Sequence, residues 1–188
     1  MQIKAILFAP LVAAGFASAA PQKSTTFEAI SLRSASPIHF AGVQAYKSHL
    51  MLNVKDQKAS CDKKSDNQAT FNLIGDELYL YRKSATPQQL WVDRSGMGQG
   101  VLQYTTGAQP ISKNGEKKGW GIDKNGNLNF KGEYFMACPN SKKAGGSWTV
   151  WLDTGLDKPG FNEGCLGFTA RTIKTTTPNS CLYTQQQQ

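Results

Sequence analysis

Histidine is nearly missing from this chain, since His39 and His49 are the only two among its 188 residues. No Gly-x-Ser-x-Gly sequence is present, so a Ser/His/Asp hydrolase has no supporting signature. The few histidines, and cysteine spacings that match no zinc pattern, leave a metal site short of ligands. We therefore expect no metal, no cofactor and no catalytic residue of these classes.

Long apolar runs are also scarce. The one clear run, Ala5–Ala14, follows Lys4 and precedes the small-residue sequence Ala17–Ala19. This is the three-part layout of a secretory signal peptide, and the run is too short to span a bilayer. Pro21 disfavours cleavage after Ala20, so we expect residues 1–19 to be removed and the mature chain to begin at Ala20. The sequence thus predicts a secreted protein with no membrane partner.

Sequons of the Asn-x-Ser/Thr type are absent, so any attached sugar is expected on serine or threonine. The Gln185–Gln188 tail shows no hydrophobic stretch that would signal a lipid anchor. Lysine and arginine outnumber acidic residues by 21 to 13, a formal net charge of +8. Such a charge attracts polyanions. The basic residues are scattered and no nucleic-acid module accompanies them, so we favour a solvated surface and expect no nucleic-acid partner.

The cysteines are even in number and all follow the predicted signal peptide, at Cys61, Cys138, Cys165 and Cys181. In a secreted chain this predicts two disulfides. Three pairings are possible and the sequence alone does not choose among them. We favour Cys61–Cys138 together with Cys165–Cys181.

Short alternating segments indicate an all-β protein. Strands are predicted at Phe27–Leu32, Thr70–Leu73, Glu77–Tyr81, Ser147–Asp153 and Leu166–Thr172. Asn125–Gly126, between Trp120–Ile122 and Leu128–Phe130, predicts a hairpin. Trp148 and Trp151 should point to opposite faces of their strand, so at most one fills the core. A helix is predicted only at Ala41–Leu50, which keeps helix below roughly a tenth of the residues.

We expect a flexible stretch at residues 20–26, one compact domain at 27–184 and a glutamine tail at 185–188. The strand–turn–strand pattern of 71–80 returns at 120–130, and each copy is followed by a tryptophan-bearing strand. Such a repeat favours a β-trefoil, and Gln89–Trp91 has the Gln-x-Trp form of sugar-binding trefoils. A β-sandwich is the alternative.

The most distinctive stretch is Val92–Gly100, with glycine at three alternate positions. A phosphate loop is excluded because no Gly-Lys-Ser/Thr ending follows. A tight excursion between two strands, with several residues at positive φ, is the predicted structure. Bare backbone lets a ligand approach. We expect an exposed sugar-stacking aromatic beside this loop, and the candidate ligand surface is Trp91, Tyr104, Ser95, Gly96, Gly98 and Gly100.

Several segments together carry a family resemblance. They are Leu78–Tyr81, Pro87–Gly100, Tyr104–Gly107, Gly119–Asp123, Ala137–Asn140 and the region of Cys165 and Cys181. They resemble the fungal cell wall protein PhiA family over the whole mature chain. A fainter likeness, at Gly119–Phe130 and the last three cysteines, links the chain to the C-terminal domain of Pir-type wall mannoproteins. Those proteins attach to glucan through glutamine-containing repeats, which this chain lacks.

The resemblance implies a secreted wall protein of filamentous ascomycetes, tied to phialide and conidium development, with no catalytic residues. Our leading hypothesis is a monomeric, non-enzymatic wall protein that associates with glucan, chitin or mannan. One alternative is a glycan-active enzyme with an unrecognised carboxylate pair, because any secreted chain offers such pairs. The other is a cationic ligand-binding or antimicrobial protein.

Overall fold

The computed structural model describes residues 23–84 and 86–186. The predicted signal peptide and the cleavage at Ala20 lie outside these residues. Across these residues the backbone forms fifteen strands and one 3₁₀ turn, η1 (Pro159–Phe161). The strands are β1 (Ser24–Leu32), β2 (Gln44–Tyr46), β3 (His49–Leu52), β4 (Ser60–Cys61), β5 (Phe71–Ile74), β6 (Glu77–Leu80), β7 (Gln88–Asp93), β8 (Val101–Thr106), β9 (Gly115–Glu116), β10 (Trp120–Ile122), β11 (Asn127–Phe130), β12 (Phe135–Pro139), β13 (Trp148–Leu152), β14 (Leu166–Lys174) and β15 (Cys181–Leu182).

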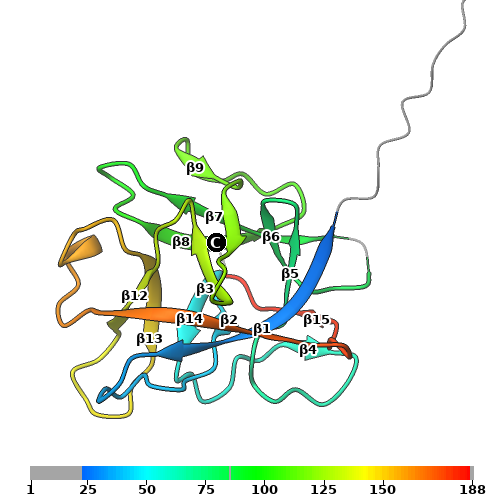
Figure 1. Ribbon diagram of the computed structural model, residues 1–188, viewed down its shortest axis with the longest axis horizontal. Coiled ribbons are helices and arrows are strands. Elements are labelled where there is room, and N and C mark those ends of the chain that lie inside the picture. Colours follow the sequence, from blue (N-terminus) through cyan, green and yellow to red (C-terminus); the bar gives the residue numbers. More distant parts are fainter. Residues whose placement is uncertain (1–22, 85, 187–188) are drawn as a thin grey trace, which may run out of the picture.

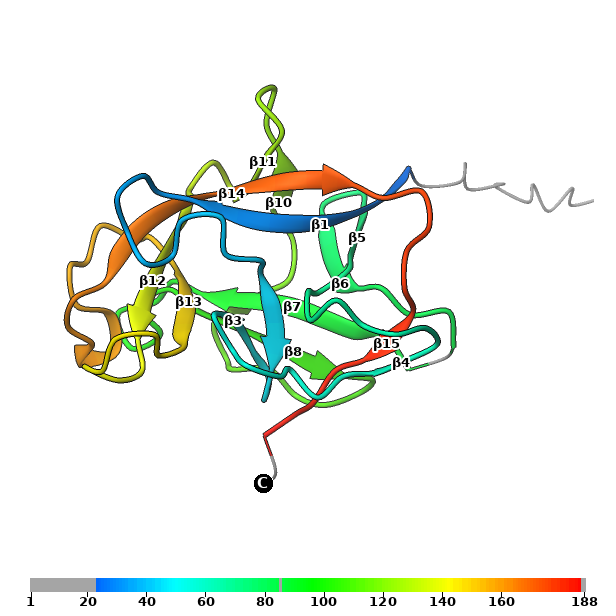
Figure 2. The same cartoon turned by 90° about the horizontal axis from the view of Figure 1, so that it is seen from below.

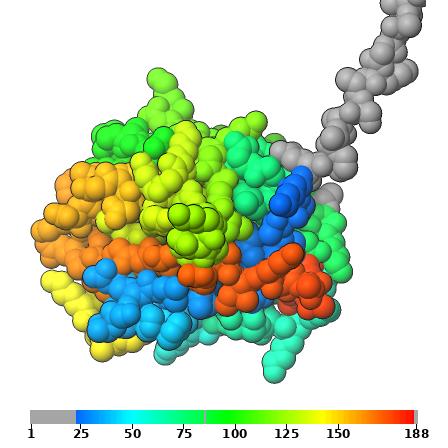
Figure 3. Space-filling view, viewed as in Figure 1, coloured from blue at the N-terminus to red at the C-terminus, as the bar shows by residue number. Residues whose placement is uncertain are grey.

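Nine strands close into a barrel, in the order β1, β5, β6, β7, β8, β3, β13, β12 and β14, with β14 pairing back onto β1. The β10–β11 hairpin extends from β14, β2 pairs with β3, and β9 covers part of β7. Figures 1 and 2 show β1 and β14 side by side as the two longest strands. In Figure 3 these two segments, blue and orange, lie next to each other on the surface. Closure leaves the ring without an exposed edge.

The predicted all-β single domain is confirmed, while the preference for a trefoil over a sandwich stays a prediction. Every strand predicted from alternation is present, and so is the hairpin at Asn125–Gly126. Trp148 packs against the core, and Trp151, three positions later, faces outward beneath Gly160, as expected. The inward residues of β7 and β8, including Leu90, are fully buried. Among the described residues no helix is long and apolar enough to cross a membrane.

The helix predicted at Ala41–Leu50 is wrong, because β2 and β3 form a hairpin there. Lys47 (φ 48°) and Ser48 (φ 65°) both adopt positive φ, the backbone of a tight primed turn. Such turns are usually marked by Asn-Gly, so this Lys-Ser pair carries no turn signal in the sequence.

The favoured disulfide pairing is also wrong. The bonds are Cys61–Cys181 and Cys138–Cys165. Cys61 and Cys181 face each other across the small β4–β15 sheet. Cys138 lies on β12 and Cys165 directly precedes β14, which pairs with β12. Strand pairing, rather than distance along the chain, therefore determines which cysteines form disulfides.

Both ends of the predicted domain differ as well. β1 begins at Ser24, within the stretch expected to be flexible, because Ser24–Phe27 pair with β5. Gln185 and Gln186, expected to be tail, hydrogen-bond to Gln109 and Ser48 in the body of the domain.

Candidate functional site

The glycine-rich loop joins β7 to β8. It is held by Asp93, a residue that is only 6% exposed. One oxygen of the Asp93 carboxylate accepts a hydrogen bond from the Ser95 N–H at 3.0 Å, and the other accepts one from the Ser112 hydroxyl at 2.7 Å. Burial alone would raise the pKa of Asp93, but these hydrogen bonds outweigh it and lower the pKa. The carboxylate therefore stays ionised and works as a loop anchor.

The glycines of this loop serve different purposes. A Cβ on Gly98 would lie 2.3 Å from the Asp93 carboxylate carbon, so this glycine allows a close approach. Gly100 has φ +87° and lies against the Leu152 carbonyl, so a side chain here would be disfavoured both by the backbone conformation and by lack of space. Gly96 has no neighbour within 4 Å of that position. The predicted excursion between two strands is confirmed, although only Gln99 and Gly100 adopt positive φ.

A second loop leans on the first. The Gly160 N–H in η1 donates to the Gln99 side-chain oxygen at 2.7 Å, across 61 residues of sequence. Trp151 supports η1 from beneath, since a Cβ on Gly160 would lie 2.8 Å from the Trp151 ring. Figure 1 shows η1, in orange, at the same end of the molecule as the green loop between β7 and β8. We call Ser95–Gly100 and Pro159–Phe161 the paired loops.

The paired loops present two almost fully exposed apolar side chains. Met97 is 93% exposed and Phe161 is 92% exposed. Phe161 also has φ +62°, an unfavourable backbone for a bulky residue. Strain of this kind persists where the surroundings enforce it, and it is frequent at binding sites. The paired loops therefore hold an aromatic ring out in solvent.

Arg94, at the base of the loop, is paired within the protein. Its guanidinium bonds the Glu116 carboxylate at 2.9 Å and the Glu133 carboxylate at 3.3 Å. Lys131 also contacts Glu116. The hydrogen bond from Arg94 is the main cause of the lowered pKa of Glu116. These charges hold one another and leave Arg94 less able to attract an anionic ligand.

The two aromatics expected to be exposed are buried, which corrects that prediction. Trp91 is 5% exposed and lies on the outer side of the barrel, beneath the segment around Gly115. Tyr104 is 1% exposed, packs in the core, and donates its hydroxyl proton to the Thr184 carbonyl. Neither aromatic side chain is therefore exposed beside the glycine loop.

The exposed aromatic beside the glycine loop is Phe161, which sequence reasoning missed. The sequence Lys158–Gly160 indicates a turn, and Phe161 follows it directly. A phenylalanine in a turn, flanked by polar residues, has no strand to bury it, and that signal was available. Its position beside Gln99 depends on a long-range contact that the sequence does not reveal.

In the described part of the chain, no cluster of three or more His, Cys, Asp or Glu side chains could hold a metal ion. Three carboxylates around the glycine-rich loop, those of Asp93, Glu116 and Glu133, are engaged by hydroxyl, amide or guanidinium groups, and Glu163, just after η1, pairs with Lys158 at 3.1 Å. The arrangement is suited to holding loops in place.

Comparisons with known proteins give a consistent result. The family described as "PhiA-like secreted protein" matches residues 27–184. The "Cell wall protein phiA" of Aspergillus niger is 48% identical over 184 residues, covering 98% of this chain and 99% of that protein. Its counterpart in Aspergillus fumigatus is 44% identical over 187 residues, covering 98% of this chain and all of that protein.

A more distant relative, the "Cell wall protein phiA" of Arthroderma benhamiae, is 42% identical over 189 residues, with 98% of this chain and all of that protein covered. No solved structure matches the chain. The family description and the names of the relatives confirm the predicted family and the predicted secreted, cell-wall location.

Proposed function

Because the chain belongs to the PhiA-like secreted protein family, we propose that it is a non-enzymatic structural protein of the cell wall that associates with wall polysaccharide. The proposal includes the role in phialide and conidium development that the family resemblance implies. The protein acts as a monomer, with glucan, chitin or mannan as its partner.

The observation that supports polysaccharide contact is Phe161, whose side chain is 92% exposed and whose backbone adopts the unfavourable φ of +62°. Pyranose rings have apolar faces that stack on aromatic side chains. A large apolar side chain kept in water is normally disfavoured, and contiguous exposed apolar groups mark interaction sites. Gln99 and Trp151 position the turn from which the ring projects.

The state of the nearby carboxylates favours a non-enzymatic role. A glycosidase needs one carboxyl group that keeps its proton near neutral pH. Hydrogen bonds lower the pKa of both Asp93 and Glu116, so neither can supply that proton. This weighs against the glycan-active enzyme as an alternative at the paired loops.

The test is retention of the mature protein on insoluble chitin, β-glucan and mannan. We expect Phe161→Ala to weaken retention on the bound polysaccharide about tenfold, with stability changed by less than ~0.5 kcal/mol because the side chain is exposed. Phe40→Ala is the matched control: Phe40 is 65% exposed, has φ +60° and lies on a separate loop between β1 and β2.

Equal retention of Phe161→Ala and the parent protein would contradict the proposed contact. Turnover of any of the three polysaccharides, assayed in parallel and lost on neutralising one carboxylate, would favour the enzyme instead. Retention on mannan alone that disappears in salt would favour the cationic alternative, in which scattered lysines attract phosphate groups.

A further inference from the structure

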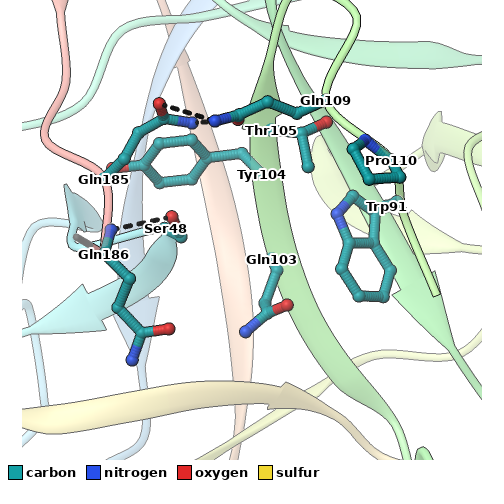
Figure 4. Close-up of a pocket in the computed structure, with 9 residues that line it drawn as sticks. All are labelled: Ser48, Trp91, Gln103, Tyr104, Thr105, Gln109, Pro110, Gln185 and Gln186. Carbon is teal, nitrogen blue, oxygen red and sulfur yellow. Dashed lines mark hydrogen bonds between the residues drawn. The ribbon is translucent and has the colours of Figure 1, made fainter. Parts of the chain in front are cut away.

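A small pocket separate from the paired loops lies on the outer side of β8, between the β2–β3 turn and the C-terminal segment. Its volume is about 160 Å³, and its walls include Trp91, Gln103, Thr105, Gln109 and Gln185. Figure 4 shows these side chains converging from β7, β8 and the last described residues. We call it the amide pocket, because glutamine side chains supply most of its polar groups.

The lining is polar but uncharged. Amide, hydroxyl and indole side chains supply its polar groups, and among the described residues no lysine, arginine or carboxylate belongs to it. In a chain with net charge +8 this neutrality is informative, because an anion site would be expected to recruit some of the surplus cations. Amides offer both donors and acceptors, the combination that matches neighbouring hydroxyl groups on one ligand.

Trp91 supplies an independent sign of a ligand. The residue is 5% exposed, and its indole N–H has no hydrogen-bond partner in the part of the chain that the structure describes. Buried indole N–H groups usually find an acceptor. The ring is fixed from the other side, since a Cβ on Gly115 would lie 3.1 Å from it. In Figure 4 the indole nitrogen faces the pocket between Thr105 and Pro110.

Gln103 places an acceptor near that donor. It pairs with Trp91 across β7 and β8, and its amide nitrogen lies 3.2 Å from the His49 Nε2. Burial is the main cause that lowers the pKa of His49, so the imidazole is neutral and can accept from this amide. The amide oxygen of Gln103 then remains for the pocket, on the side of Trp91 in Figure 4.

One wall of the pocket comes from the C-terminal segment. The side chains of Gln109 and Gln185 exchange two hydrogen bonds, at 2.6 and 3.3 Å. The Gln186 N–H donates to the Ser48 hydroxyl at 3.2 Å.

The volume of the amide pocket lies below the roughly 300–1,000 Å³ of pockets for drug-sized ligands. A single small unit fits such a site better than a polysaccharide segment does.

We propose that the amide pocket binds one neutral, hydroxyl-rich unit, a single pyranose such as the end of a sugar chain, through the Trp91 indole N–H and the Gln103 amide. The inference rests on the proposed function only in taking wall sugar as the source of that unit. A ligand hydroxyl accepts from the indole and donates to the Gln103 oxygen, which satisfies both groups.

The test is a titration of the mature, disulfide-bonded protein with glucose, mannose and N-acetylglucosamine, observed through the indole N–H signals in NMR spectra. Trp91→Phe identifies the Trp91 signal by its loss and keeps most of the packing. We expect one of the sugars to shift that signal, and we expect Trp91→Phe and Gln103→Ala each to weaken binding about tenfold. Trp120→Phe is the matched control, because its buried indole N–H also has no partner among the described residues but lies on β10, away from both proposed sites.

Binding that is unchanged in both pocket variants, or no shift of the Trp91 signal with any of the three sugars, would overturn the inference. So would tighter, salt-sensitive binding of mannose 6-phosphate, which would point to the nearby Lys47 and Lys58 instead. Gln103→Ala guards against misfolding of Trp91→Phe. If Phe161→Ala loses polysaccharide retention while the pocket binds no sugar, only this inference fails. If the pocket binds sugar but no polysaccharide retains the protein, only the proposed function fails.

Discussion

Two hairpin connections in this protein are organised by an aspartate at the same place, yet they behave differently. In the β7–β8 loop, Asp93 accepts from Ser95 N–H, and its carbonyl accepts from Gly100 N–H at 2.8 Å. In the β10–β11 turn, Asp123 accepts from Asn125 N–H, and its carbonyl accepts from Gly126 N–H at 2.9 Å. The local device is therefore shared.

The difference lies in what surrounds each carboxylate. Asp93 is buried and bound to Ser112, which lies beyond the next strand, whereas the second oxygen of Asp123 bonds Tyr134 and Asn127 near the surface. The first loop is fitted into the body of the protein and braces a distant turn. The second turn is also joined to a distant strand, because Arg171 donates to the Asn125 carbonyl and the Thr172 N–H donates to the Gly126 carbonyl. The two turns therefore differ in how deeply their aspartate is buried, and not in whether long-range contacts are present.

The largest expected effect comes from adding a methyl group to each turn. Gly98→Ala forces a Cβ to within 2.3 Å of the Asp93 carboxylate carbon and should cost about 3 kcal/mol, since overpacking adds to disturbed hydrogen bonds. Gly126→Ala meets nothing closer than 3.7 Å and pays only for φ +79°, about 1 kcal/mol. Urea unfolding of both variants measures the two losses. Equal losses would show that the close approach of Gly98 to Asp93 adds nothing to the cost of the substitution.

How far each turn could be predicted from sequence follows from the same contrast. The Asn125–Gly126 hairpin was predicted with its strands because its determinants are adjacent in the chain. The Ser95–Gly100 loop was predicted as an excursion, but its partner Gly160 and the exposed Phe161 were not, since one hydrogen bond across 61 residues creates that neighbourhood. The prediction that Trp91 is exposed fails because the segment around Gly115 folds over its ring, a contact that no local pattern in the sequence indicates. The barrel closure and the disulfide partners likewise depend on which distant strands pair.

The second prediction compares how the Asp93 and Asp123 carboxylates contribute to stability as the pH falls. Hydrogen bonding, first from the Asn127 N–H, lowers the pKa of Asp123 from 3.8 to about 2. A lowered pKa in the folded state stabilises the protein above the unfolded value, and that contribution is lost as pH falls from about 4 through about 2. Asp93, whose pKa is also lowered, should lose its contribution in the same direction.

At pH 7 we expect Asp93→Ala to cost about 2 kcal/mol, because the Ser95 N–H and the Ser112 hydroxyl lose a charged acceptor that lies at a buried position. Asp123→Ala should cost less, because water reaches its partners. The difference in unfolding free energy between each variant and the parent should shrink as the pH is lowered from 5 to 2. A difference that stays constant over this range would show that the ionised carboxylate does not contribute.

The smallest expected effect on stability tests whether the paired loops depend on each other. Gln99→Ala removes the acceptor of the Gly160 N–H but leaves that exposed group free to bond water, so the loss in stability should stay below about 1 kcal/mol. Retention on polysaccharide should fall about threefold, because Phe161 is then less firmly positioned.

Arg171→Met is the matched control for the second turn, since Arg171 donates a comparable long-range hydrogen bond to the Asn125 carbonyl. It should leave retention unchanged. If both variants lowered retention equally, the hydrogen bond from the distant residue would not distinguish the two turns. If neither did, the ring of Phe161 would owe its position to Trp151 alone, and the hydrogen bond between the paired loops would be structural detail without a role in binding.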